Sequence, residues 1–438
     1  MKNKLGKNDI LSILNDWNVW RKDLETGIIR TTYFEKIQAF NQDNHIIVVT
    51  GARRSGKSFI MRQYIKELIT RGVSKEETVM INFEDPRWGM LTVQDIDRVY
   101  ETYVEYLKPK GKPYVFLDEV QEVEGWERWV RKTHELAQAD LILSGSNAKL
   151  LSKELSTLLT GRHVDVTVFP LSFKEFLDFQ GIDATDMLDI ADQRIAIQRL
   201  CMEYIQFGSF PEVVLGKNKK EILFHYFDDV VSKDILKRYK IRKPEQLKSL
   251  VKFYLSNTSS LTTFSSTEKF LAFSADTIEK FAGYLETAYL FFFLKRFSFK
   301  IKEQEKSPRK VYCIDSGLAH AVSFRFSENR GQRAENIVFL ELLRRGSGSR
   351  EELYYWKDAQ HREVDFVVKE GERIIELIQV CWELQEIRTK ERELRSLIKA
   401  SNELACKTLL VITGEYEGEE EVEGKDIRYV PLWKWLLA

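Results

Sequence analysis

Short apolar runs and longer stretches of helical spacing alternate over the first 170 residues of the chain. The apolar runs cover residues 45–50, 78–83, 114–117 and 141–144, and the helical patterns cover residues 59–70, 93–107 and 126–138. Runs that are apolar at almost every position are typical of strands buried on both faces of a sheet, and the helices between them would serve as crossovers. The pattern predicts an α/β fold with a parallel sheet, preceded by helices in residues 1–40.

The hydrophobic pattern changes after residue 170. Helical spacing continues to about residue 300, and β-rich runs between helices follow to the end of the chain. We therefore expect three domains, at residues 1–170, 171–308 and 309–438. Within the middle region the pattern predicts helices at 247–255, from Ser259 onward and at 274–286, and strands at 289–297 and 311–314. This order resembles a winged helix-turn-helix.

The composition narrows the class of protein. The 438 residues include 67 basic and 67 acidic side chains, and 43% of them are apolar, which is enough to build packed cores. The four cysteines are widely spaced, which favours free thiols in a reducing cytoplasm over a disulfide framework or a zinc site. No apolar run approaches the ~20 residues needed to cross a bilayer. We therefore expect a soluble cytoplasmic protein with no membrane partner.

A glycine-rich segment follows the first predicted strand. Residues 51–58 match the pattern GxxxxGK[ST] at each fixed position. Glycines let the backbone wrap around a polyphosphate, with N–H groups and the start of the next helix facing the negative charge. The segment predicts an ATP site formed by Gly51, Ala52, Arg53, Arg54, Ser55, Gly56, Lys57, Ser58 and Phe59. Within it, Lys57 would reach the β- and γ-phosphates and Ser58 would bind Mg²⁺.

Acidic and polar residues after two later strands would complete this site. Asp118 and Glu119 directly follow the third predicted strand. Asp118 is predicted to hold Mg²⁺, and Glu119 to act as the general base on the attacking water. The fourth predicted strand is followed by Ser146 and Asn147. Either side chain could hydrogen-bond the water or the γ-phosphate, although such residues also favour simple turns.

Motifs along nearly the whole chain resemble one prokaryotic family of AAA+ P-loop ATPases. Besides the glycine-rich segment they comprise residues 83–87, 117–121, 144–146, 160–162, 169–173, 207–212 and 310–318. The resemblance implies an AAA+ module, a helical or winged-helix region and a small C-terminal α/β domain similar to PD-(D/E)XK nucleases. It also implies that Arg162 could reach the γ-phosphate of a neighbouring subunit in a ring or other homo-oligomer. A simple ion pair of Arg162 is the alternative interpretation.

Basic residues gather in two segments beside the predicted winged helix. Residues 294–310 contain seven basic and two acidic side chains, and residues 231–250 contain the same numbers. Such clusters suit contacts with the phosphate backbone of DNA, although they could also form a solvated face. The predicted recognition helix at 274–286 is not basic, which disfavours the reading of bases. We expect DNA as a partner, bound weakly or by an oligomer.

The C-terminal segment carries an incomplete nuclease motif. PD-(D/E)XK nucleases use an Asp and, on the next strand, an acid two residues before a Lys to bind Mg²⁺ and activate water. Glu335 and Asp365 fit acidic positions, but Gln379 stands in place of the second-strand acid and Cys381 in place of the lysine. A register with Glu376 restores the acid but not the lysine. We expect a degenerate site, which could serve as an inactive DNA-binding platform.

These features predict a Mg²⁺-dependent ATP hydrolase that binds DNA and couples ATP turnover to DNA binding or remodelling as a homo-oligomer. Three alternatives remain: an ATP-dependent nuclease, a nucleotide-driven switch or chaperone that acts on a protein, and a scaffold without turnover. The adjacent Asp118 and Glu119 argue against the scaffold.

Overall fold

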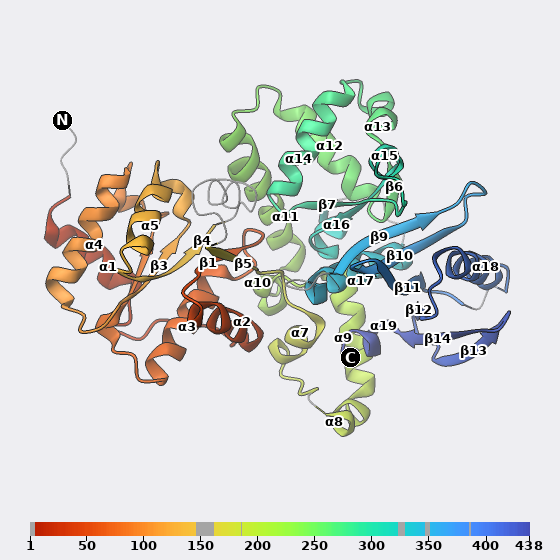
Figure 1. Cartoon of the computed structure of the whole chain (residues 1–438), viewed down its shortest axis with the longest axis horizontal. Coiled ribbons are helices and arrows are strands. Elements are labelled where there is room, and N and C mark those ends of the chain that lie inside the picture. Colours follow the sequence, from red (N-terminus) through yellow and green to blue (C-terminus); the bar gives the residue numbers. More distant parts are fainter. Residues whose placement is uncertain (1–4, 146–161, 185, 323–328, 347–350, 385–386) are drawn as a thin grey trace. The chain divides into compact units, whose positions relative to one another are not determined.

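The structure is a computed structural model that describes residues 5–145, 162–184, 186–322, 329–346, 351–384 and 387–438 (Figure 1). Contacts within the chain divide it into two units, Met1–Val168 and Phe169–Ala438. Among the described residues, no helix combines the length and the hydropathy needed to cross a bilayer. The four cysteines are buried free thiols, as their spacing predicts.

The first unit is built on a parallel sheet, which confirms the predicted α/β fold (Figure 1). The sheet order is β2-β3-β4-β1-β5, and each neighbouring pair is parallel. The strands are β1 (Ile46–Thr50), β2 (Thr78–Asn82), β3 (Tyr114–Asp118), β4 (Asp140–Ser144) and β5 (His163–Thr167). The helices are α1 (Lys7–Trp17), α2 (Thr31–Gln42), α3 (Lys57–Thr70), α4 (Val93–Leu107) and α5 (Trp126–Glu135), with 3₁₀ turns η1 (Lys75–Glu77), η2 (Pro86–Trp88) and η3 (Val120–Glu122).

Helices cover both faces of this sheet. Side chains of one face, such as Val48 and Leu117, pack against α1, α4 and α5. Side chains of the other face, such as Val49 and Phe116, pack against α2 and α3. Because successive strand residues point to opposite faces, β1 to β4 contribute to both cores, and their residues are apolar at nearly every position, whereas β5 contributes Val166 alone. The loops at the ends of the strands are thereby held on a rigid support.

Asn18 protects the open edge of the sheet at β2. Its side-chain amide donates to the carbonyl of Met80 at 2.9 Å and accepts from the N–H of Met80 at 2.7 Å. The same amide donates to the carbonyl of Leu14 at 2.7 Å and so fixes the end of α1 against the strand. An edge strand with its backbone groups satisfied in this way offers less of a template for pairing with another chain.

The second unit contains two sheets (Figure 1). The first is antiparallel and three-stranded, in the order β6-β8-β7, with strands β6 (Ser260–Thr262), β7 (Phe291–Leu294) and β8 (Arg309–Cys313). The second is mixed and six-stranded, in the order β13-β14-β12-β11-β10-β9, with strands β9 (Glu351–Lys357), β10 (Glu363–Glu370), β11 (Arg373–Cys381), β12 (Leu409–Thr413), β13 (Gly418–Val422) and β14 (Lys425–Pro431).

Helices of three kinds surround these sheets. Those before the first sheet are α7 (Phe173–Phe179), α8 (Met187–Asp192), α9 (Arg194–Phe207), α10 (Pro211–Leu215) and α11 (Lys219–Asp229), which continues into the π-helix η4 (Val230–Lys237). Those interleaved with it are α12 (Pro244–Ser256), α13 (Phe264–Leu271), α14 (Ala275–Thr287) and α15 (Ile301–Lys306). Those of the C-terminal part are α16 (Ser316–Val322), α17 (Arg330–Gly346), α18 (Ile387–Leu404) and α19 (Leu432–Trp435).

The middle region differs from the predicted pattern at one helix. The predicted start of the second helix at Ser259 is wrong, because residues 260–262 form β6 and pair with β8. Ser259 begins this pairing, since its N–H donates to the carbonyl of Val311 at 2.7 Å. The helix itself is present as α13, which begins at Phe264. The predicted third helix is confirmed as α14, and the side chain of Ser274 caps its first turn.

Strand β8 lies at the centre of the three-stranded sheet. Its two neighbours, β6 and β7, both precede it in the chain. The predicted domain boundary at residue 309 therefore falls on the first residue of a strand that pairs only with residues before that boundary. The same strand is tied to the C-terminal part, because the side chain of Asn336 on α17 bonds both the N–H and the carbonyl of Cys313.

Candidate functional site

The glycine-rich loop follows β1, where the strand order of the first sheet changes direction. Strand β1 has β4 on one side and β5 on the other, and such a switch point leaves a crevice at the carboxyl ends of the strands. Gly51 opens the loop with φ +137°, and a Cβ there would lie 2.1 Å from the carbonyl oxygen of Val168. Gly56 closes the loop with φ +100° as the N-cap of α3. The backbone itself therefore requires glycine at both ends of the loop.

Two polar groups inside this loop suit the oxygens of a phosphate. The ammonium of the buried Lys57 lies 3.1 Å from the carbonyl oxygens of both Gly51 and Ala52, and 3.8 Å from Oε1 of Glu119. The hydroxyl of Ser55 is buried and has no hydrogen-bond partner within the described part of the chain. A buried donor without an acceptor is costly, so an anion in the loop would satisfy a need already present in the fold.

The residues predicted to hold Mg²⁺ are in contact. The carboxylate of Asp118, at the end of β3, accepts hydrogen bonds from the hydroxyls of Ser58 and Ser144. Burial raises the pKa of Asp118 to about 6, and the charge of Glu119 adds to the shift, whereas the two hydroxyls and Lys57 oppose it. A hydroxyl and a carboxylate oxygen side by side form a donor set that suits Mg²⁺. These residues therefore fit the metal that the glycine-rich motif implies.

Glu119 adopts an unusual backbone conformation beside Asp118. Its φ of +53° lies in the left-handed region, which is uncommon for residues other than glycine and is often found at functional sites. The N–H of Glu119 donates to the hydroxyl of Ser144 at 3.1 Å, and Gln121 donates to its carboxylate. The side chain is thereby directed toward Lys57, with 8% of the residue exposed.

Sequence reasoning missed Ser144 as a functional residue. Its hydroxyl links Asp118 and Glu119, and its position at the last residue of a strand next to β3 was the available signal. The predicted Ser146 and Asn147 lie outside the described residues. Sequence reasoning also missed Arg30, which donates to the carbonyl of Ser55 at 2.8 Å and so supports the backbone of the loop.

Three further residues of the predicted ATP site, Arg53, Arg54 and Phe59, differ in their contacts and exposure. Arg53 forms an ion pair of 3.0 Å with Glu84, in the segment after β2. Arg54 has a left-handed φ of +69°. Phe59 is 41% exposed on the first turn of α3, and the guanidinium of Arg62 lies 5.3 Å from its ring. Phe59 is therefore the predicted residue with an accessible aromatic surface.

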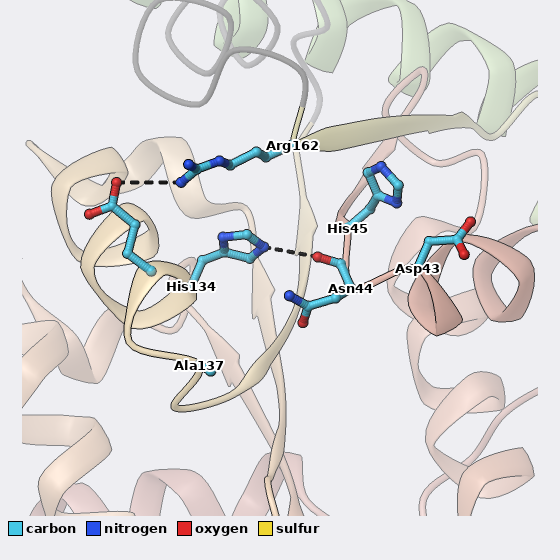
Figure 2. Close-up of a pocket in the computed structure, with 7 residues that line it drawn as sticks. Asp43, Asn44, His45, His134, Ala137 and Arg162 are labelled. Carbon is cyan, nitrogen blue, oxygen red and sulfur yellow. Dashed lines mark hydrogen bonds and ion pairs between the residues drawn. The ribbon is translucent and has the colours of Figure 1, made fainter.

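Arg162 lies at the opposite end of the sheet from the glycine-rich loop. It directly precedes β5, and its carbonyl accepts from the N–H of Ile46 at the start of β1 at 2.9 Å. Figure 2 shows its side chain beside a pocket lined by His134 and Asn44, in an ion pair of 3.5 Å with Glu135. A strand of five residues spans about 16 Å at ~3.3 Å per residue. Arg162 therefore cannot contact a phosphate held by its own loop.

In the second unit, the predicted nuclease residues are brought together around a buried lysine. The ammonium of Lys310, on β8, lies 2.7 Å from Oδ1 of Asp365, 2.9 Å from Oε1 of Glu335 and 2.8 Å from Oε1 of Glu363. Gln379 faces Asp365 across the strands and accepts its N–H at 3.2 Å. The sequence motif lacks a lysine after Gln379, but the fold supplies one from a different strand.

The pKa values of the charged groups around Lys310 are strongly shifted. Burial by itself would lower the pKa of Lys310, but Asp365 and Glu335 raise it well above its ordinary value of 10.5. Burial also raises the pKa of Glu335 to about 8, against the effect of Lys310. Glu376, the alternative acid of the motif, is influenced by the charges of Arg345, Arg428 and Glu351, and makes no contact with Lys310 among the interactions described.

The basic side chains of residues 294–310 are less available for contacts with DNA phosphates than the composition of the segment suggests. Lys310 is only 2% exposed and is not part of a basic surface, which corrects its inclusion among the predicted DNA-contacting residues. Other basic side chains of the segment have acidic partners within it. These pairs are Lys295 with Glu305 at 2.5 Å, Lys300 with Glu303 at 3.1 Å and Arg309 with Glu305 at 3.3 Å.

The domain type of the first unit follows from its glycine-rich loop and parallel sheet, together with a match to a known protein family. A family model described as an AAA domain matches residues 43–177, which include β1, the glycine-rich loop, Asp118 and Glu119. The first unit is therefore an AAA domain of the P-loop type. Two further models, each described as a domain of unknown function (DUF8612 and DUF4143), match residues 198–329 and 330–435.

Two relatives match the chain over nearly its whole length. An uncharacterized protein of Haemophilus influenzae is 33% identical over 417 residues, which are 93% of this chain and 98% of that protein. The uncharacterized protein MJ1544 of Methanocaldococcus jannaschii is 34% identical over 425 residues, 92% of each chain. The chain belongs to the same family as these two proteins.

Solved structures match more distantly. PCH-2 of C. elegans has a TM-score of 0.26 and 11% identity, over 65% of this chain and 71% of that one. AMPPCP-bound DnaA from Aquifex aeolicus has a TM-score of 0.24 and 12% identity, over 59% of this chain and 89% of that one. Scores this low carry no conclusion about function.

Proposed function

We propose that this protein hydrolyses ATP in a Mg²⁺-dependent reaction. The observation that carries the proposal is the convergence of charged groups at the carboxyl ends of β1 and β3. Ser58 bonds Asp118, and Lys57 lies 3.8 Å from Glu119 in the same buried site. The match of residues 43–177 to an AAA domain supports the same conclusion.

Each group has a role that its surroundings allow. The backbone of the glycine-rich loop, the Ser55 hydroxyl and the Lys57 ammonium would bind the phosphates. Ser58 and Asp118 would hold Mg²⁺, which when bound neutralises charge on the phosphate oxygens. Glu119 would accept a proton from the attacking water, with its carboxylate positioned by Gln121 and its backbone by Ser144.

Turnover of ATP by the full chain tests this proposal. Glu119→Gln should lower kcat by ~10²–10⁴-fold, the usual contribution of a general base, while nucleotide binding persists. Glu122→Gln is the matched control, because Glu122 is an exposed residue on the adjacent 3₁₀ turn and loses the same charge. Equal turnover in both variants would remove Glu119 from the mechanism, and no turnover by the unaltered chain would refute the ATPase itself.

We propose DNA as the partner that this turnover serves. The order α12-β6-α13-α14-β7-α15-β8 supports a winged helix, because a helix, a strand, two helices and a two-stranded wing follow one another around a three-stranded sheet. The basic segment at 231–250 supports contacts with phosphates, since Arg242 and Lys243 are exposed just before α12.

The DNA proposal is tested by binding and by stimulation of turnover. Arg242→Ala with Lys243→Ala should weaken DNA binding and lower the slope of log affinity against log salt by about two, one for each phosphate contact. Arg395→Ala on α18, where Arg395 pairs with Glu391, is the matched control. Binding and turnover that respond to no form of DNA at low salt would favour the alternative partner, a protein.

We propose that a second copy of the chain supplies Arg162 to the ATP site. Its position at the far end of β1 supports a role in another subunit, because its own loop is out of reach. Arg162→Ala and Glu119→Gln should each be inactive, but a mixture should regain turnover if the subunits assemble and exchange. An Arg162→Ala variant that turns over like the unaltered chain would instead identify Arg162 as a simple ion pair with Glu135.

A further inference from the structure

The carboxylate centre of the second unit is already occupied by a cation of the chain. An ammonium has three N–H groups, and that of Lys310 has three carboxylate oxygens within 2.9 Å, one each from Glu335, Glu363 and Asp365. Lys310 is 2% exposed, so solvent does not compete for these contacts. All three acids thus meet at one buried ammonium, and the raised pKa of Glu335 reduces the negative charge that this ammonium must balance.

A divalent metal, which the resemblance to PD-(D/E)XK nucleases implies here, does not fit this arrangement. Mg²⁺ needs oxygens at ~2.0–2.1 Å around a point of near-octahedral geometry. The point shared by the three carboxylates is the position of the Lys310 nitrogen, so metal and ammonium would exclude one another. The second carboxylate oxygen of Glu363 is also occupied, because it forms an ion pair of 2.9 Å with Lys357.

Two further oxygens near the centre, from Asp365 and Gln379, already accept backbone N–H groups. Oδ2 of Asp365 accepts the N–H of Val380 at 2.9 Å. The amide of Gln379 uses its oxygen for the N–H of Asp365 at 3.2 Å and its nitrogen for Glu393 at 2.7 Å. Gln379 therefore positions the strands rather than presenting its oxygen to a metal.

The strand that carries Lys310 cannot easily withdraw it. Tyr312, on the same face of β8, stacks on Phe339 of α17 with ring centroids 4.0 Å apart and donates to Glu335 at 2.7 Å. Asn336 of α17 bonds both backbone groups of Cys313. Removing the ammonium would require β8 to leave the face that packs against α17.

We propose that Lys310 permanently takes the place of the divalent metal, so that the nuclease-like centre is an internal ion cluster that binds no metal and cleaves no phosphodiester. This inference is independent of ATP hydrolysis in the first unit. It makes the three-stranded sheet part of the centre, because the cation of the cluster comes from the middle strand of that sheet.

Binding of Mn²⁺ to the full chain, followed by electron paramagnetic resonance without nucleotide, tests this. Lys310→Met should gain one bound Mn²⁺ per chain over the unaltered protein, and a second change, Asp365→Asn, should abolish the gain. Lys357→Met is the matched control, because it removes a cation that contacts Glu363 alone, and it should gain none. Any Mn²⁺ bound at the glycine-rich loop is common to all variants and cancels.

Two results would overturn the proposal. One is a folded Lys310→Met variant that gains no Mn²⁺. The other is Mn²⁺ that the unaltered protein binds and that Asp365→Asn alone removes, since the centre would then hold metal in spite of the lysine. If Lys310→Met does not fold, the comparison of the unaltered protein with Asp365→Asn decides, and equal Mn²⁺ binding by the two supports the proposal.

Discussion

Asp118 titrates in a range where metal binding can be followed, because burial raises its pKa to about 6. A proton on this carboxylate competes with Mg²⁺, so the apparent dissociation constant for the metal scales as 1 + 10^(pKa − pH). With a pKa of about 6 this factor is about 11 at pH 5 and about 1.1 at pH 7. We therefore expect Mg²⁺ to bind about tenfold more tightly at pH 7 than at pH 5, with little further gain at higher pH.

The assay is a Mg²⁺ titration of the complex with a non-hydrolysable ATP analogue at a series of pH values. Ser144→Ala provides the matched variant, because the Ser144 hydroxyl lowers the pKa of Asp118, and its loss should move the midpoint to higher pH. Titration of the nucleotide phosphates affects both proteins equally. If the affinity is flat from pH 5 to pH 7, or if both proteins share one midpoint, Asp118 is not the metal ligand.

Three substitutions test the supports of the fold. Asn18→Ala should lower the free energy of unfolding by about 1–3 kcal/mol, because two backbone groups of Met80 lose their partner, and denaturant titration measures this. Gly51→Ala should abolish nucleotide binding, measured by calorimetry, since its Cβ would lie 2.1 Å from the oxygen of Val168; unchanged affinity would contradict the required close approach. Asp315→Ala should lower the free energy of unfolding by about 3 kcal/mol or more, because its buried carboxylate accepts the N–H of Ser209 and two N–H groups of the first turn of α16, and an unchanged melting temperature would contradict that role.

The first unit was predictable because local pattern and tertiary environment agree there. Strands β1 to β4 are apolar on both faces, and both faces are buried, so periodicity alone located them. Strand β5, which alternates polar and apolar residues and is only partly buried, was not predicted. The start of the second helix was misplaced at Ser259, because the three residues of β6 are too few for periodicity to separate a strand from a helix. Pairing with β8, some fifty residues later, decided the conformation.

Site residues that are adjacent in sequence could be predicted, and those that only the fold brings together could not. Lys57 and Asp118 belong to motifs whose residues are adjacent in sequence, so their positions could be predicted. Ser144 was missed, because its role depends on the side chain of a neighbouring strand and the one signal in the sequence was its position at a strand end. The lysine of the second centre was sought two residues after Gln379, whereas Lys310 reaches Asp365 from 55 residues earlier in the chain.

The central position of β8 has a consequence for how the second unit unfolds. A cut before residue 309 would leave β6 and β7 without the strand that lies between them, and would leave β8, which carries Lys310, without both of its neighbouring strands. Neither half retains its own interior after such a cut. We therefore expect residues 244–438 to unfold in a single cooperative transition, and limited proteolysis near residue 309 to destroy both halves rather than release a stable fragment.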